Sequence, residues 1–377
     1  MRVLVLSSTF PQYADDPRGR FILRHWEARA RGGDQVRFLV PDTAWVQGSL
    51  ASECEVVRFR YAPHDLSSLT GQWGILENIR DRPWRALLVL PFFAALHRSL
   101  RREIDRFQPD LLVAHMLLPG GLIAARLARE AGLRCVLHGH GTDVDLALAL
   151  PEVLRRTVLR TLLTAERLTF PSAEKLRRFT AALGLTTAPA NCHIEAMLAS
   201  LPDLPDLPDP HVVPATRDVL FLGRLIKQKG VDDLLRAAAI MADPPRLEIA
   251  GDGPERPRLQ AMAAAHHLDA RFHGFVHPPA KDALYRRAAV LCVPSRDVGG
   301  LSEGAPLVIA EARRYGLPVV ATAVGGIPEL MHDLYPGASL VRPGAPEALA
   351  LALSRALEHA SETPSRVGKH GPVASSR

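Results

Sequence analysis

Lysine is scarce in this sequence, and the patterns of several common protein classes are missing. Of the 46 lysine and arginine residues only five are lysine, whereas arginine is spread along the chain. No run of basic residues carries interleaved aromatic side chains, so nucleic acid is not an expected partner although the net charge is +6. An anionic small substrate or an anionic membrane surface suits this charge as well.

Cysteines and long apolar runs are also few. The four cysteines form no CxxC pair, so we expect buried thiols and neither a zinc site nor a disulfide framework; they are Cys54, Cys135, Cys192 and Cys292. The longest apolar run, 86–96, is well short of the roughly 20 residues that span a membrane. The opening MRVLVLSSTFP indicates a first buried strand and no signal peptide. We therefore expect a cytoplasmic protein.

What the sequence does contain is a regular alternation of buried strands and amphipathic helices. A length of 377 residues favours two domains. Helical spacing marks 21–33, 120–132 and 173–184, and each of these segments ends at glycine. Strands are predicted at 2–7, 36–41, 110–115, 134–139, 167–172, 218–223, 246–251, 270–275, 289–295 and 317–322. This order predicts an α/β fold with two doubly wound, Rossmann-like parallel-sheet domains facing a cleft.

The alternation breaks once, in a segment that contains five prolines and three LPD triplets. We interpret this segment as a linker. The predicted organisation is a first domain at 1–196, the linker at 197–217, a second domain at 218–360 and a polar, non-periodic tail at 361–377, which we expect to be disordered.

The stretch LFLGRLIKQKG (220–230) concentrates positive charge where a strand ends. Gly223 permits a sharp exit from the strand, Arg224 and Lys229 flank a short loop, and Gly230 opens the next helix. A guanidinium, an ammonium group and helix-start amides near one point suit a diphosphate. The alternative is a solvated surface turn, and Lys227 fits that interpretation.

A pair of glutamates, Glu303 and Glu311, lies further along the chain with Pro306 between them. Pro306 fits the first turn of a helix, which would place Glu311 about two turns beyond Glu303. The apolar residues 307–310 predict that this helix is buried, so Glu311 needs a partner. Ribose hydroxyls and a structural salt bridge are both suitable partners.

Taken together, these motifs resemble a known family. GRLIKQKG, AGDGPE, PS (294–295), EGAPLVIAE (303–311) and TAVGGIPEL (322–330) follow in an order and spacing similar to family 4 retaining glycosyltransferases of the GT-B fold (bacterial glycosyl transferases group 1). The resemblance implies a UDP-sugar or GDP-sugar donor in the second domain, no metal requirement, and a glycan or lipid-linked acceptor, with a role in cell-surface polysaccharide biosynthesis.

The resemblance also implies roles for residues of the second domain. Arg224 and Lys229 neutralise the leaving diphosphate, with Gly223 beside them. Glu311 binds the ribose. Glu303 and the segment after it hold the donor sugar and the β-phosphate; that segment is Gly304, Ala305, Pro306 and Leu307.

In the first domain, candidate residues follow the predicted strands, where ligands of such sheets bind. Gly19 lies in the loop after the first strand and matches a glycine-bearing loop of the family. HGTD resembles the HGxD segment of the family, so His140 is expected to face the reacting sugar, with Asp143 and His115 as substrate-binding candidates. Alternatively, His138 and His140 cap the strand end and bond to backbone.

Residues 80–106 are a candidate membrane-facing element, since arginines flank an apolar stretch with Trp84 and two phenylalanines. The alternative is a core helix with solvated charged ends.

Two other functions stay open, a catalytically inactive sugar-nucleotide-binding subunit and a GT-B sugar-nucleotide epimerase. The chain departs from the family at 194–201, which lacks the usual glycine, and in its polar end, where the family has returning helices.

Overall fold

The computed structural model describes residues 1–14, 16, 18–48, 50–71, 73–195, 216–332 and 338–362. The chain divides into two compact units. Unit 1 takes Met1–Pro202, Asp297–Pro306 and Val324–Glu329, and unit 2 takes Asp203–Arg296, Leu307–Ala323 and Leu330–Arg377. The two segments 297–306 and 324–329, which we expected in the second domain, therefore group with unit 1. Most of the predicted linker and tail lies outside the described residues.

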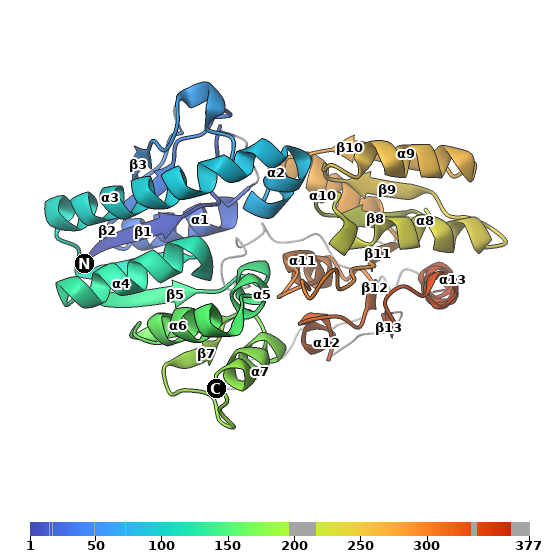
Figure 1. Cartoon of the computed structure of the whole chain (residues 1–377). Coiled ribbons are helices and arrows are strands. Elements are labelled where there is room, and N and C mark those ends of the chain that lie inside the picture. Colours follow the sequence, from blue (N-terminus) through green and yellow to red (C-terminus); the bar gives the residue numbers. More distant parts are fainter. Residues whose placement is uncertain are drawn as a thin grey trace, which may run out of the picture. The chain divides into compact units, whose positions relative to one another are not determined.

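Unit 1 is built on a seven-stranded parallel sheet with the order β3-β2-β1-β4-β5-β6-β7 (Figure 1). Five strands lie where the sequence predicts them: β1 (Arg2–Ser7), β2 (Gln35–Pro41), β4 (Leu111–His115), β5 (Arg134–His138) and β6 (Arg167–Phe170). The prediction missed the edge strands β3 (Glu55–Phe59) and β7 (Cys192–Ile194). Both are short and only partly buried, so they lack the continuous apolar run of a central strand.

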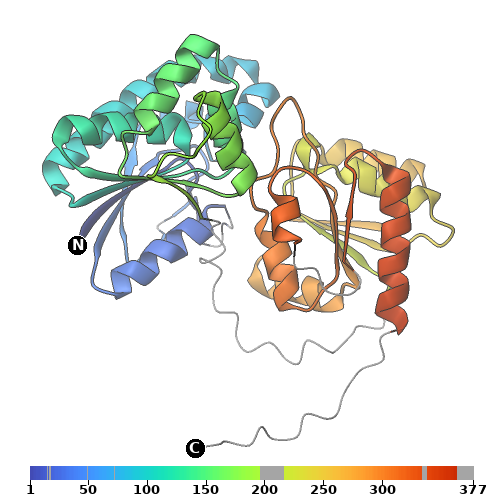
Figure 2. The ribbon, with the colours of Figure 1, turned by 90° about the horizontal axis from the view of Figure 1, so that it is seen from below.

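Helices cover both faces of this sheet. They are α1 (Arg20–Arg31), α2 (Ile75–Asp81), α3 (Val89–Phe107), α4 (Leu122–Ala131), α5 (Thr142–Leu148), α6 (Glu152–Leu162) and α7 (Ala173–Ala182), with short helical turns η1 (His64–Leu66), η2 (Pro83–Leu88) and η3 (Leu117–Gly121). Figure 2 shows α1, in blue, on one side of the sheet and the cyan and green helices on the other.

Side-chain alternation along β1 explains this layering. Val3 and Val5 belong to a core cluster that includes Ile22, Leu23 and Trp26 of α1. Leu4 and Leu6 belong to a second cluster, which contains the buried apolar residues of α3 and α4. Because successive side chains of a strand point to opposite faces, a fully apolar strand must be covered twice.

Unit 2 is built on a six-stranded parallel sheet with the order β10-β9-β8-β11-β12-β13. Its strands are β8 (Val219–Leu222), β9 (Leu247–Ala250), β10 (Ala270–Gly274), β11 (Val290–Val293), β12 (Val319–Thr322) and β13 (Ser339–Val341). All but the edge strand β13 were predicted. The helices of this half of the chain are α8 (Val231–Ile240), α9 (Arg256–Ala265), α10 (Pro278–Arg287), α11 (Leu307–Arg314), α12 (Ile327–Leu330) and α13 (Pro346–Glu362), with the turn η5 (Lys227–Lys229). Residues of α8 and α13 contribute to one core cluster with the strands.

The candidate membrane element is not one continuous helix. It begins in α2, breaks at Arg82, passes through η2 and continues as α3. One face of α3 is buried in the core, including Phe92, Leu96 and Leu100. The core-helix alternative therefore holds for α3, while Leu87 of η2 and Leu90 in the first turn of α3 are 79% and 80% exposed.

The four cysteines are free and buried, as expected. Burial raises the pKa of the Cys54 thiol to about 11, which keeps that thiol protonated at neutral pH. In the part of the chain that the structure describes, no helix is long and apolar enough to cross a membrane.

Candidate functional site

Three histidines gather at the carboxyl ends of β4 and β5 in unit 1. His115 and His138 are the last residues of these strands and pair in register, and His140 follows two residues later. The His115 and His138 rings stack with centroids 4.9 Å apart and an interplanar angle of 17°. Nδ1 of His115 lies 3.1 Å from Nε2 of His140. His115 and His140 therefore lie at strand ends, as the sequence predicts, and they are in contact with each other. His138 belongs to the same cluster.

Burial keeps these imidazoles neutral. It lowers the pKa of His140 to about 4 and that of His138 to about 4, and it lowers the pKa of His115 well below its usual range. Nδ1 of His138 lies 2.8 Å from Oγ1 of Thr169, so this ring bonds to a side chain at the next strand. The ring of His140 bonds to His115 and not to backbone, which differs from the capping alternative.

Trp26 is a member of this cluster that the sequence did not single out. Its indole Nε1 donates to Nε2 of His115 at 2.9 Å, from the buried face of α1. Its position on that face is typical of a core residue, so helical spacing alone gave no signal of a polar contact.

Asp143 supports the loops around the histidines. Its carboxylate accepts hydrogen bonds from the backbone N–H of Leu117 at 2.6 Å and of His140 at 2.9 Å. Burial raises the pKa of Asp143, and these backbone donors act in the opposite direction. The carboxylate therefore connects η3 to the loop that carries His140.

Gly19 serves the start of α1. It has a φ of 68°, and a Cβ at this position would lie 2.6 Å from the carbonyl oxygen of Thr9. No side chain fits this approach of two backbone segments. The fold therefore requires glycine at this position, whether or not Gly19 also contacts a ligand.

A buried ion pair anchors the segment that leads to Glu303. Nζ of Lys175 lies 2.8 Å from both carboxylate oxygens of Asp145, and both side chains are fully buried. Ser302, which groups with unit 1, accepts from Nζ of Lys175 at 2.6 Å and donates its backbone N–H to Asp145 at 2.8 Å. The sequence prediction missed both residues of the pair, because they are 30 positions apart in the chain.

The predicted helical spacing of the two glutamates is wrong. α11 begins at Leu307, so Glu303 and Pro306 precede the helix, and Glu303 is not two helical turns from Glu311. Within α11 only Ile309 and Ala312 are buried, so the helix is less buried than its apolar run predicted. Proline lacks an N–H and stands here before the first helical residue. Gly304 and Ala305 lie in the same segment, which groups with unit 1.

The basic loop of unit 2 has the predicted local structure. β8 ends at Leu222, η5 covers 227–229, and Gly230, with a φ of 62°, directly precedes α8. Lys229 is half-buried, and its Cε lies 3.7 Å from the place of a Cβ on Gly223. Lys227 is exposed, as the solvated alternative predicted for it.

Two glycines of AGDGPE explain how this loop is held. A Cβ on Gly251 would overlap the carbonyl oxygen of Gly223, and a Cβ on Gly253 would overlap that of Leu225. Leu225 also donates its N–H to the carbonyl of Asp252 at 2.9 Å. The loop after β8 and the loop after β9 therefore pack backbone to backbone, and this packing fixes the backbone of Arg224 in the loop after β8.

Glu311 has the partner that its surroundings require. Its Oε1 lies 2.5 Å from Nζ of Lys281, and its Oε2 accepts from the hydroxyl of Tyr285 at 2.7 Å. The Tyr285 ring stacks on Tyr315 with centroids 4.8 Å apart. The salt-bridge alternative is thus realised in the structure, through two residues of α10 that the sequence prediction missed.

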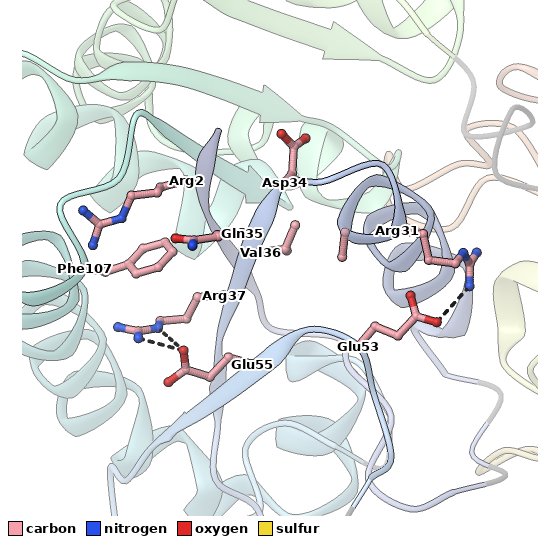
Figure 3. Close-up of a pocket in the computed structure, with 10 residues that line it drawn as sticks. Arg2, Arg31, Asp34, Gln35, Val36, Arg37, Glu53, Glu55 and Phe107 are labelled. Atoms are coloured by element: carbon pink, nitrogen blue, oxygen red, sulfur yellow. Dashed lines mark hydrogen bonds and ion pairs between the residues drawn. The ribbon is translucent and has the colours of Figure 1, made fainter.

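A cavity of about 540 Å³ lies at the amino ends of strands of the unit 1 sheet, whereas the histidines lie at the carboxyl ends (Figure 3). Its lining includes the first residues of β1, β2 and β3. Among its lining residues, Arg37 and Glu55 pair at 2.7 Å, and Arg31 and Glu53 pair at 3.3 Å. Because these charges compensate each other, we assign the candidate site to the carboxyl ends of the strands and not to this cavity.

Two family patterns match the chain. The pattern described as Glycosyl transferases group 1 matches residues 209–373, and the pattern described as Glycosyltransferase Family 4 matches residues 20–191. The GDP-mannose-dependent alpha-(1-6)-phosphatidylinositol monomannoside mannosyltransferase of Mycolicibacterium smegmatis is 33% identical over 300 residues, covering 72% of this chain and 75% of that protein. The chain belongs to the family 4 (group 1) glycosyltransferases.

Other similarities are more local or concern the fold. The D-inositol 3-phosphate glycosyltransferase of Mycolicibacterium gilvum is 38% identical over 148 residues, which are 37% of this chain and 32% of that protein. Sucrose-phosphate synthase from Thermosynechococcus elongatus superposes with a TM-score of 0.69 at 20% identity, covering 96% of this chain and 91% of that chain. Anabaena Alr3699/HepE, solved with UDP and glucose, superposes with a TM-score of 0.65 at 16% identity, covering 96% of this chain and 93% of that chain. These structures establish a GT-B fold of two Rossmann-like sheets.

Proposed function

We propose that this chain is a retaining glycosyltransferase that moves a sugar from a UDP-sugar or a GDP-sugar to a glycan or lipid-linked acceptor. We place it in the biosynthesis of cell-surface polysaccharide or glycolipid. The observation that carries the proposal is the loop 223–230, where the half-buried Lys229, Arg224 and the start of α8 come together. The named relatives and the structures with UDP support a nucleotide-sugar donor.

The chemistry of the transfer explains why cations stand in this loop. Cleavage of the anomeric C–O bond leaves positive charge on the sugar ring and negative charge on the diphosphate. Groups that already carry positive charge at the leaving group stabilise this transition state directly. The guanidinium of Arg224 and the ammonium group of Lys229 fill this role in our proposal, and the amino end of α8 adds its partial charge.

The remaining candidate residues divide by unit. In unit 2, Glu311 binds the ribose while Lys281 and Tyr285 hold its carboxylate in place. In unit 1, His140 and Glu303 act on the sugar, and the loop with Gly19 faces the donor phosphates and the acceptor. We further propose that transfer needs no resident metal ion, which activity in the presence of EDTA would test.

Nucleotide binding is the first test. A ligand that binds the folded state raises apparent stability by about 2.7 kcal/mol at one hundred times its Kd. We expect UDP or GDP, but not NAD, to raise the melting temperature of the wild type. Lys229→Ala should lose this shift. Lys227→Ala is the matched control, because the same charge is removed from an exposed neighbour, and it should keep the shift. A shift that survives Lys229→Ala would place the diphosphate elsewhere.

Turnover distinguishes the alternatives. Product NMR with the bound donor should show a glycosidic bond with the donor's anomeric configuration, and an inverted product would end the retaining assignment. Nucleotide binding without transfer would favour the inactive subunit. Interconversion of the donor without an acceptor would favour the epimerase.

We also propose that unit 1 contacts an anionic membrane surface through residues 80–90, which we call the η2 region. Trp84, Leu87 and Leu90 are exposed there, and the exposed Arg80 and Arg82 stand beside them in the chain. An apolar surface flanked by arginines suits the interface of an anionic bilayer, which in turn suits a lipid-linked acceptor.

A further inference from the structure

The order of donors and acceptors around the histidine cluster determines where each ring carries its proton. An indole N–H can only donate, so Nε2 of His115 must accept from Trp26. A neutral imidazole has one protonated nitrogen, and His115 therefore carries its proton on Nδ1. That N–H points to Nε2 of His140, 3.1 Å away, which must accept. His140 in turn carries its proton on Nδ1.

We infer that Trp26 and His115 are positioning residues that fix the Nδ1–H tautomer of His140, so that His140 meets its ligand as a neutral hydrogen-bond donor and not as a base. The ligand chemistry that this donor recognises is an oxygen with a free lone pair, such as a sugar hydroxyl or a phosphate oxygen. The inference about this ligand rests on the proposed function. The inference about the tautomer rests on unit 1 alone.

The surroundings hold this arrangement in place. His115 is 1% exposed, and its ring is held between Trp26 on one side and the stacked His138 on the other. His138 bonds to Thr169, and the backbone N–H of His140 is held by Asp143. Each ring that could rotate is therefore bonded or packed, which is what a fixed tautomer requires.

This chain of hydrogen bonds from Trp26 through His115 to His140, the relay, also limits the chemistry of His140. Because Nε2 already accepts from His115, and Nδ1 carries the proton, neither nitrogen can take a proton from the acceptor alcohol. His140 therefore stabilises an oxygen by donation, and the proton of the acceptor goes elsewhere. This differs from the common use of histidine as a general base.

Nitrogen NMR of the full-length protein labelled with ¹⁵N-histidine tests the tautomer directly. We expect the wild type to show His140 protonated at Nδ1, with the signal assigned by its loss in His140→Gln. Trp26→Phe keeps the bulk of the side chain but removes the indole N–H, and it should convert His140 to a mixture of tautomers. Trp45→Phe is the matched control, since Trp45 packs under Arg85 elsewhere in unit 1, and it should leave the spectrum unchanged.

A pair of His115 variants gives a second test. Asparagine keeps an amide near the Nδ1 position, whereas glutamine keeps one near Nε2. We expect His115→Asn to preserve the His140 tautomer better than His115→Gln. Protonation of His140 at Nε2 in the wild type would overturn the inference, and so would an unchanged tautomer in Trp26→Phe.

Kinetics then connect the relay to transfer. Trp26→Phe should lower kcat roughly tenfold and leave the Kd for the nucleoside diphosphate unchanged, because the relay acts on one hydrogen bond and not on the diphosphate. An unchanged kcat beside a changed tautomer would overturn the role toward the ligand. If no transfer is found with any donor, the proposed function fails, and the NMR result still decides the tautomer.

Discussion

At the scale of single residues, the scarce lysines occupy distinct environments. Lys175 is buried against Asp145, Lys281 pairs with Glu311, and Lys229 is half-buried in the basic loop, whereas Lys227 is exposed. An ammonium group is a compact charge that responds strongly to burial, so it suits places where one point of positive charge is needed. The abundant arginines more often form paired contacts at the surface, such as Arg134 with Glu166.

The buried pair in unit 1 leads to a stability prediction. Lys175→Met leaves the Asp145 carboxylate without its main partner, although Arg178 still reaches one oxygen. We expect a loss of about 3 kcal/mol in the free energy of unfolding, measured by urea denaturation. Lys227→Met, the exposed control, should change it by less than about 0.5 kcal/mol. Addition of Asp145→Asn to Lys175→Met should restore part of the loss, and a further loss would contradict this explanation.

The histidine cluster predicts how stability depends on pH. The folded protein holds His138 and His140 neutral down to about pH 4, whereas the unfolded chain protonates them below about pH 6.5. Their contribution is therefore fully present above pH 6.5 and is lost as the pH falls, at about 1.4 kcal/mol per pH unit for each histidine.

A variant isolates one of these groups. His138→Asn keeps an atom near Nδ1 for Thr169 and removes the titration, while the other groups that affect its pKa, His25, His140, Arg167 and Glu195, stay in place. Between pH 6 and 5, its unfolding free energy should fall less steeply than that of the wild type. Parallel curves from urea denaturation would refute the assignment.

At the scale of elements, the sequence predicted the central strands and the edge strand β10, and it missed the other three edge strands. Central strands are covered on both faces and appear as continuous apolar runs, whereas β3, β7 and β13 are short and partly exposed, so no run marks them. The start of α11 was also predicted wrongly. Pro306 fits either a first helical turn or the residue before it, and only the folded chain decides between them.

The glycine before α8 allows a prediction at this scale. Gly230 has a φ of 62°, and a Cβ there would overlap the carbonyl oxygen of Pro294. We expect Gly230→Ala to cost about 3 kcal/mol or more, because strain and overlap add.

Gly344 provides the matched comparison, with a φ of 65° and nothing within 4 Å of the added Cβ. Gly344→Ala should cost only about 1 kcal/mol, for the left-handed backbone alone. Equal losses in thermal or urea unfolding of the two variants would show that the contact with Pro294 does not matter.

At the scale of the whole molecule, a positive net charge and an exposed apolar site together favour binding to an anionic surface. We expect the protein to sediment with phosphatidylglycerol vesicles and not with phosphatidylcholine vesicles, and salt should weaken binding. Leu87→Asp with Leu90→Asp should lower the association constant for these vesicles by roughly a thousandfold, since burying each leucine contributes about 2 kcal/mol and each 1.4 kcal/mol is a factor of ten.

A second exposed apolar pair in unit 1 serves as the control. Val153 and Leu154 of α6 are 83% and 51% exposed. Their replacement by aspartate should leave vesicle binding unchanged. Equal losses in the two double variants would mean that charge alone, and not the η2 region, determines binding.

The sequence by itself determined the fold class, the central strands of both sheets and the family, because these depend on local apolar runs and on glycines beside charged residues. It also placed His115 and His140 at strand ends. The tertiary structure alone decided which side chains meet: Trp26 with His115, Lys175 with Asp145, and Glu311 with Lys281 and Tyr285. Most of these contacts join residues tens of positions apart, and chain folding brings them together without leaving a periodic signal in the sequence.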